Sequence, residues 1–136
     1  MIMNEKVAVD TNILIYLHDD SIILKKRIAL EIMAKKPAIS NQVISEYLNV
    51  LKRLTKKPKS ILIEHCLLTV EGCEIISINY GLIEKAKDLI NKYDFQLFDS
   101  LIVSSALQSN CNILYSEDLH HNLLVDNRLR IINPFI

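Results

Sequence analysis

The chain has 136 residues, half of them hydrophobic, and its 16 basic and 16 acidic side chains give a net charge of zero. We expect a single globular domain, residues 1–136, with an aliphatic core. The only two glycines are Gly72 and Gly81, which excludes the closely spaced glycines of a dinucleotide-binding turn or a Walker phosphate loop. No segment is apolar for long enough to cross a membrane and no signal peptide is evident. The three cysteines, Cys66, Cys73 and Cys111, lack a CxxC spacing and are expected to be reduced, as in a cytoplasmic protein.

Short apolar runs alternate along the chain with amphipathic segments of helical periodicity. Strands that alternate with helices predict an α/β domain, in which a mostly parallel sheet is covered on both faces. The expected elements are, in chain order, strand 7–9, helix 13–17, helix 21–36, strand 38–39, helix 41–55, helix 60–72, strand 74–78, helix 80–90, helix 99–109, strand 112–115 and strand 130–132.

Acidic side chains stand where two of the expected strands end. Asp10 directly follows strand 7–9, and Asp118 follows strand 112–115 after two intervening residues. Ligands of open parallel sheets bind beyond the carboxyl ends of the strands, so these two carboxylates can share one site if their strands are neighbours. Each residue also has a structural explanation: Asp10 can cap the next helix, and Glu117 and Asp118 can form an acidic turn.

Two further acids lie on expected helices. Asp99 shares a helix face with apolar residues, where an unpaired carboxylate is costly to bury, although a role as helix cap explains it equally well. Glu46 lies beside the apolar stripe of its helix, where an ordinary surface ion pair is the alternative. The apolar residues on the Asp99 face are Ile102, Val103 and Ala106.

These four acids have no lysine or arginine close to them in sequence. Carboxylates gathered in one place repel one another and need protons or cations to be tolerated. Ligands that offer only oxygen select a hard cation, Mg²⁺ or Mn²⁺, and such an ion can activate water and stabilise charge on a phosphodiester. The sequence therefore predicts metal-dependent phosphate chemistry at one edge of the sheet.

Four segments, in this order, resemble the motifs of the PIN-domain family, and the match is closest to the VapC-type toxins of type II toxin–antitoxin pairs. A fifth segment resembles the end of these domains. The segments are Val9-Asp10-Thr11-Asn12, then 45–51 around Glu46, 98–106 around Asp99, 114–119 around Asp118, and the terminal 131–135.

This resemblance implies a Mg²⁺- or Mn²⁺-dependent endoribonuclease on a three-layer α/β/α sandwich, with five parallel strands in the order 3-2-1-4-5. It also implies an RNA substrate, a homodimer and a cognate antitoxin protein. Carried onto this chain, it makes Asp10, Glu46, Asp99 and Asp118 the catalytic and metal-binding acids. It further implies that Thr11, Asn12 and Ser116 hydrogen-bond to these carboxylates and orient them. The alternative is a PIN-like domain that binds RNA or protein without cutting, which the presence of all four acids disfavours.

Two details lie outside the acidic motifs. A basic run, with Arg53, Lys56, Lys57 and Lys59, is either a solvated helix end or a surface that positions RNA phosphates. Because few aromatic residues are expected on the surface, we expect recognition by RNA shape and backbone. After the fourth motif, relatives carry a glycine where this chain has Asn122, a residue that also tolerates a left-handed backbone.

Overall fold

The computed structural model describes residues 5–136. Residues 1–4 lie outside the described residues. They are part of the expected domain and of the N-terminal stretch in which no signal peptide was expected. The elements are β1 (Val7–Val9), α1 (Thr11–Tyr16), α2 (Ile23–Ala34), β2 (Ile39–Ser40), α3 (Asn41–Thr55), α4 (Lys59–Val70), β3 (Ile75–Ile76), α5 (Tyr80–Tyr93), α6 (Leu97–Gln108), β4 (Ile113–Tyr115), β5 (Leu124–Val125) and β6 (Leu129–Ile132).

Five parallel strands run side by side in the order β3-β2-β1-β4-β6. Parallel ladders join β2 to β3, β1 to β4 and β4 to β6. A parallel bridge between Ala8 and Ala38 links the two halves, with hydrogen bonds from the Ala38 N–H to the Val7 carbonyl (2.8 Å) and from the Val9 N–H to the Ala38 carbonyl (3.3 Å). The expected fold class and the strand order 3-2-1-4-5 are thus confirmed for the parallel strands.

The number of strands differs from the expected five, because β5 adds a sixth. It pairs antiparallel with β6 at the edge of the sheet. The two strands are joined by a turn in which Asp126 and Asn127 both have positive φ angles, 50° and 56°. Asp and Asn adopt this conformation more readily than most residues, so the hairpin closes without glycine. The expected strand 74–78 is also shorter than predicted, as β3 comprises only Ile75–Ile76.

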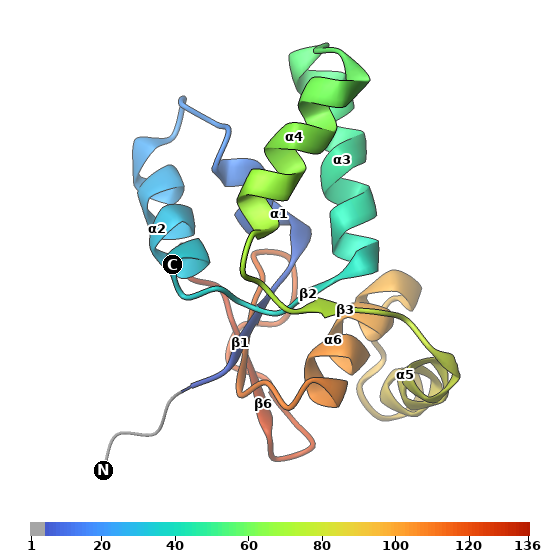
Figure 1. Ribbon diagram of the computed structural model, residues 1–136. Coiled ribbons are helices and arrows are strands. Elements are labelled where there is room, and N and C mark those ends of the chain that lie inside the picture. Colours follow the sequence, from blue (N-terminus) through green and yellow to red (C-terminus); the bar gives the residue numbers. More distant parts are fainter. Residues whose placement is uncertain (1–4) are drawn as a thin grey trace.

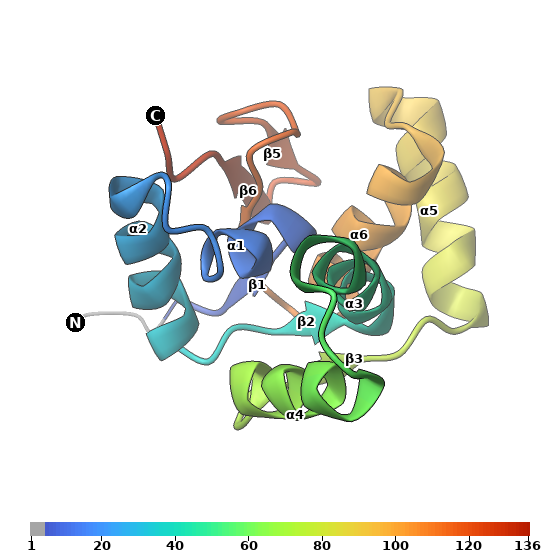
Figure 2. The same ribbon diagram turned by 90° about the horizontal axis from the view of Figure 1, so that it is seen from above.

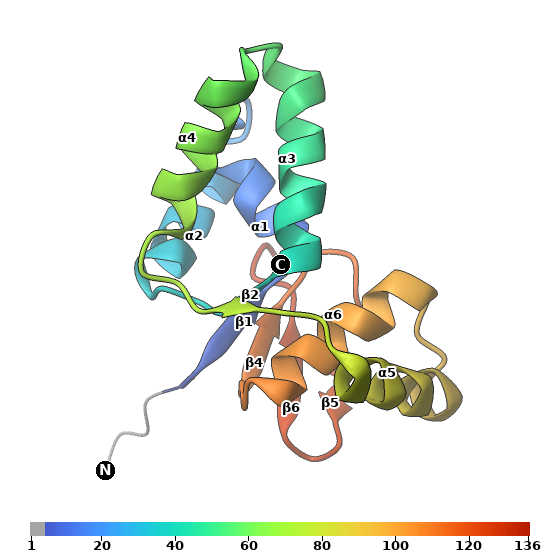
Figure 3. The same ribbon diagram turned by 45° about the vertical axis from the view of Figure 1, so that its right-hand side comes forward.

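Helices cover the sheet on both sides. Seen from above, α1 and α2 lie on one side of the row of strands, and α5 and α6 lie on the other (Figure 2). Helices α3 and α4 form a hairpin that rises from the sheet at the end of β2 (Figures 1 and 3). The carboxyl ends of β1, β2 and β4 therefore meet beneath α1, the base of α3 and the start of α6.

Helix α3 is fixed at its base by a cap and at its middle by a buried tyrosine. The Ser40 hydroxyl accepts a hydrogen bond from the Val43 N–H (3.2 Å), the capping interaction typical of a helix start. Tyr47 is fully buried, and its hydroxyl lies 3.1 Å from the Thr69 hydroxyl of α4 and 2.5 Å from the His18 ring. These contacts set the rotation of α3, which determines where Glu46, the preceding residue, is presented.

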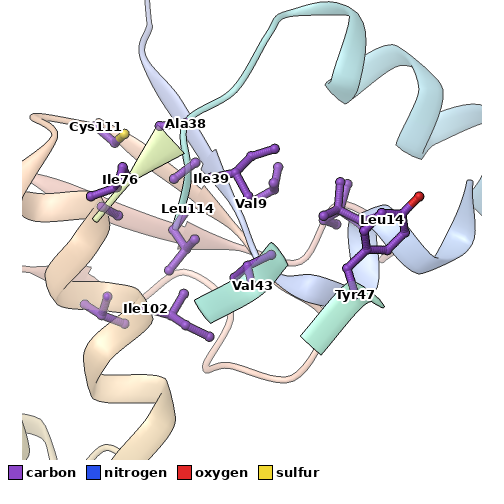
Figure 4. Close-up of a cluster of buried hydrophobic side chains, with 14 of the residues drawn as sticks. Val9, Leu14, Ala38, Ile39, Val43, Tyr47, Ile76, Ile102, Cys111 and Leu114 are labelled. Atoms are coloured by element: carbon purple, nitrogen blue, oxygen red, sulfur yellow. The ribbon is translucent and has the colours of Figure 1, made fainter. Parts of the chain in front are cut away.

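The hydrophobic core lies between the strands and these helices. Figure 4 shows Val9, Ile39 and Leu114 from three neighbouring strands beside Val43 of α3 and Ile102 of α6. All five are at most 5% exposed. This packing holds the starts of α3 and α6 against the carboxyl edge of the sheet.

Some helices also leave large apolar side chains on the surface. Ile63, Leu67 and Leu68 of α4 are 51–66% exposed, and Ile23 and Leu24 of α2 are exposed to the same degree. Within residues 5–136, no helix combines the length and apolar character needed to span a membrane.

Candidate active site at the carboxyl edge of the sheet

All four predicted acids line one open pocket of about 330 Å³. Asp10 follows β1, Asp118 follows β4, Glu46 comes from α3, and Asp99 lies in the first turn of α6. Strands β1 and β4 are hydrogen-bonded neighbours, as the shared-site prediction requires. The remaining lining residues are Thr11, Asn12, Ile15, Tyr16, Val50, Phe98 and Ile102.

Asp10 is the most deeply buried of the four acids, at 5% exposure. One carboxylate oxygen accepts from the Thr11 N–H (2.7 Å) at the start of α1, and the other accepts from the Ser116 hydroxyl (2.8 Å). Ser116 also accepts from the Leu119 N–H (3.3 Å), which ties the loop after β4 to the same carboxylate. Asp10 is therefore a helix cap, as its structural explanation proposed, and at the same time a wall of the pocket.

Glu46 is held through both of its oxygens. The Thr11 hydroxyl donates to one oxygen (2.7 Å) and the Gln42 amide donates to the other (3.1 Å). The same Gln42 nitrogen donates to the Phe98 carbonyl (3.3 Å), so it connects α3 to the first turn of α6. Thr11 thus orients one carboxylate with its backbone and another with its side chain.

Asp118 and Asp99 are less constrained. The Asn12 side chain donates to Asp118 (3.2 Å), so each of the three predicted orienting residues contacts at least one of the four acids. The cap position of α6 is Gln96, and Asp99 lies three residues further on. The N-cap explanation of Asp99 is therefore wrong, although an acid in the first turn still favours the helix dipole.

The four carboxylates of the pocket repel one another. Burial raises the pKa of Asp10, against the lowering effect of its two hydrogen bonds, and the charges of Asp99 and Glu46 add to the rise. Burial also raises the pKa of Asp99, and Asp118 and Glu46 raise it further. Within residues 5–136, none of the four acids forms an ion pair with a basic side chain. The pocket therefore holds negative charge that only protons or an external cation can compensate.

The donor set is suited to a hard dication, but it does not form a closed cage. In the described part of the chain, no three Asp, Glu, His or Cys side chains converge tightly enough to ligate one ion together. Mg²⁺ is usually held by one or two carboxylates and keeps several waters, which an open pocket of about 330 Å³ can accommodate. The residues therefore fit Mg²⁺ or Mn²⁺ as a partly hydrated ion, with Asp10 and Asp99 as the acids we expect to lie nearest to it.

Two contacts around the pocket were not predicted. Gln42 is one, and its position four residues before Glu46 on the same helix is a signal that sequence inspection can detect. The other is a cluster in which the Tyr16 hydroxyl donates to Glu117 (2.6 Å) and Lys25 forms an ion pair with the same carboxylate (2.6 Å). Glu117, a fifth acid beside the site, is thereby neutralised within the protein, whereas the other four are not.

The predicted basic residues divide between two surfaces. Arg53, Lys56 and Lys57 line an open groove together with Lys52 and Asn49, whereas Lys59 lines an adjoining hollow between α3 and α4. Lys52 and Arg53 occupy the last turn of α3, where cations favour the helix dipole. Arg53 also lies seven residues, or two turns, beyond Glu46, so the groove continues the helix face that borders the acidic pocket.

The loop after β4 behaves as the sequence suggested. Asn122 has a φ of 71°, so asparagine takes a left-handed backbone conformation at this turn. His120 is exposed. The ring of His121 accepts a hydrogen bond from the Asn133 N–H (2.9 Å), so it braces the end of the chain.

The unfavourable contribution of Asp10 and Asp99 to the stability of the metal-free protein should shrink as the pH falls from neutral toward 3.8. The pKa values of Asp10 and Asp99 are raised in the folded state, so that state binds protons more tightly than the unfolded chain there. Stability lost at neutral pH is consequently recovered as these acids protonate. Urea unfolding with a chelator, for wild type and Asp99→Asn, checks this. The free energy of unfolding of wild type minus that of the variant should rise with falling pH. A difference that does not change with pH would contradict this expectation.

Comparisons with known proteins agree with this architecture. The family model of the PIN domain matches residues 7–124. A structure described as a toxin–antitoxin complex from Klebsiella pneumoniae has a TM-score of 0.70 at 20% identity, covering 95% of this chain and 97% of that chain. VapC20 of Mycobacterium tuberculosis, described as a sarcin-ricin loop cleaving toxin, has a TM-score of 0.65 at 17% identity, covering 83% and 90%.

No curated protein matches this chain in sequence. At these identities the two structures establish a shared fold. The family assignment rests on the model match, which spans the segments that carry all four acids, from β1 to the loop after β4. The chain belongs to the PIN-domain family.

Proposed function

We propose that this protein is a Mg²⁺- or Mn²⁺-dependent endoribonuclease and the toxin of a type II toxin–antitoxin pair. The observation that carries the proposal is the pocket in which Asp10, Glu46, Asp99 and Asp118 meet, without a basic partner among residues 5–136. The two structural relatives, described as a toxin–antitoxin complex and a sarcin-ricin loop cleaving toxin, support the same assignment.

The protein's own residues would bind the metal ion and orient the acidic side chains. Asp10 and Asp99 would hold the metal ion, and Glu46 and Asp118 would complete its surroundings through water. Thr11 and Gln42 fix both oxygens of Glu46, so this side chain is oriented before substrate arrives. Asn12 and Ser116 do the same for Asp118 and Asp10.

The bound ion would supply activation of water and stabilisation of charge on the phosphodiester. Water attacks phosphorus, and the bond from phosphorus to the 3′ oxygen breaks. The leaving oxygen takes up a proton, so the products carry a 5′-phosphate and a 3′-hydroxyl. Glu46, held on two sides and half-buried, would help to position that water.

Wild-type protein incubated with transfer RNA and ribosomal RNA fragments should cleave them in Mg²⁺ or Mn²⁺ and not in excess EDTA. Product ends identified by ligation and by phosphatase sensitivity should carry the 5′-phosphate. Asp10→Asn, which keeps the shape and capping capacity of the side chain, is the matched inactive control. RNA binding without cleavage by the wild type would favour the non-cleaving PIN-like module instead.

The groove of Arg53, Lys56 and Lys57 should position the RNA backbone. Replacing all three with glutamine should raise the Kd for RNA and flatten its dependence on salt, by about 0.7 in log–log slope per lost contact. Lys87→Gln removes one charge from the exposed surface of α5 and serves as control. Filter binding with the inactive Asp10→Asn background measures this, and an unchanged slope would leave these residues as a solvated helix end.

A further inference from the structure

Phe98 is the exposed aromatic residue of the acidic pocket. It lines the pocket beside Asp99, and it is 62% exposed. A single exposed apolar side chain is ordinary on a protein surface, so exposure alone says little. The position is what matters here, because the ring borders the same pocket as the four carboxylates.

The backbone of Phe98 is tied to the acids. Its carbonyl accepts from the Gln42 amide (3.3 Å), the same nitrogen that donates to Glu46 (3.1 Å). In the described chain no aromatic ring stacks on Phe98 and no cation lies over it. The residue is thus fixed relative to the carboxylates while the faces of its ring remain without an aromatic or cationic partner.

Tyr16, the other aromatic lining residue, is already engaged. Its ring packs edge-on against Phe135 with centroids 4.9 Å apart, and Lys25 lies 4.7 Å from its centroid. Its hydroxyl donates to Glu117 (2.6 Å). Of the two aromatic residues, Phe98 is therefore the one with a ring available to a ligand.

We propose that Phe98 stacks on a nucleobase next to the scissile phosphate and selects RNA in which that base is unpaired. The inference rests on the proposed ribonuclease function. A phosphate held at the acids through a metal ion places its flanking bases beside the wall of the pocket, where Phe98 lies. Stacking on an aromatic ring is independent of base identity but requires a base out of the helix. Recognition is then not by backbone and shape alone, which revises the expectation from the sequence.

The test uses steady-state cleavage of a short single-stranded RNA that spans a mapped cleavage site. Phe98→Leu keeps an apolar side chain and removes the ring, and it should raise KM about 5- to 160-fold, the range expected for losing one stacked base. Phe98→Tyr, which keeps an aromatic ring at this position, should have the KM of wild type. A substrate with an abasic nucleotide flanking the cut should impair the wild type and have little further effect on Phe98→Leu.

Two measurements separate stacking from damage to the site. The Mn²⁺-induced rise in melting temperature should be the same in Phe98→Leu and wild type, because the Phe98 side chain has no oxygen ligand to offer a hard cation. Tyr80→Leu is the matched control, since Tyr80 is 78% exposed on α5 and does not line the pocket. 2-Aminopurine at the flanking position of an RNA with a non-hydrolysable linkage at the cut should be quenched on binding to wild type in Mn²⁺, and not on binding to Phe98→Leu.

The outcomes are distinguishable. Cleavage by wild type with the same KM for Phe98→Leu overturns the stacking role and leaves the ribonuclease function standing. Weaker binding of the antitoxin by Phe98→Leu, with KM unchanged, assigns the residue to a protein interface and also overturns it. Absence of cleavage by wild type overturns the function and the inference together.

Discussion

Replacing Asp99 with asparagine will reduce RNA cleavage by at least about 100-fold while the protein remains folded. Loss of a residue that only supports a metal ligand costs 10- to 100-fold, and loss of a ligand itself should exceed that range. A neutral amide is a poor partner for a hard dication. Asp99 is not the cap of α6, so its replacement removes no capping hydrogen bond. Single-turnover cleavage in Mn²⁺ measures the effect.

Stability separates this role from a structural one. The metal-free Asp99→Asn variant should melt at the same temperature as wild type or higher, because one of several repelling charges is gone. The loss of an acid from the first helical turn opposes this by about 0.3–1 kcal/mol. Asp88→Asn, which removes a surface carboxylate of α5, should change neither property. Full activity of Asp99→Asn would show that Asp99 is not a metal ligand.

Expression of the protein alone will arrest growth, and co-expression of the small open reading frame beside its gene will restore growth. Four carboxylates that have no ion-pair partner in the described part of the chain can accept an arginine or lysine of an inhibitory protein. We therefore expect a stable complex in which the antitoxin covers the pocket. Growth curves with separately inducible genes and co-purification measure this.

The same electrostatic reasoning gives the control. Asp10→Asn expressed at the wild-type level should be harmless, which ties toxicity to the acidic pocket. The complex formed by Asp99→Asn should dissociate faster at low salt, because one charge of the pocket is lost. If the wild type is harmless alone, or the neighbouring protein never co-purifies, the toxin–antitoxin proposal is wrong.

The sequence was sufficient for the order of elements because periodicity and cap residues are local. It placed the helix at 99–109 where α6 spans Leu97–Gln108, and it placed strands at β1, β2, β4 and β6 within a residue or so. It missed β5 because two residues, Leu124 and Val125, carry no periodicity, and their pairing depends on β6. The start of α1 was placed two residues late because Thr11 and Asn12 are also suitable cap residues, whereas the cap is Asp10.

The acids could be predicted for a similar reason. A carboxylate at a strand end, or on an otherwise apolar helix face, conflicts with burial, and that conflict is visible in one segment at a time. The Lys25–Glu117 pair joins residues 92 positions apart, so no local pattern contains it. Phe98 could not be recognised as exposed from its sequence, because its exposure depends on which face α6 turns toward α3.

A Mn²⁺ titration followed by two readouts tests the central claim most directly. In one series the melting temperature is measured, which reports binding to the folded state, and in the other the rate of RNA cleavage. We expect the two midpoints to coincide in wild type, and both responses to be lost in Asp10→Asn. Two results would contradict the assignment of this pocket as a metal-dependent ribonuclease site. One is cleavage by wild type that persists in excess EDTA. The other is cleavage by Asp10→Asn although the melting temperature of this variant does not respond to Mn²⁺.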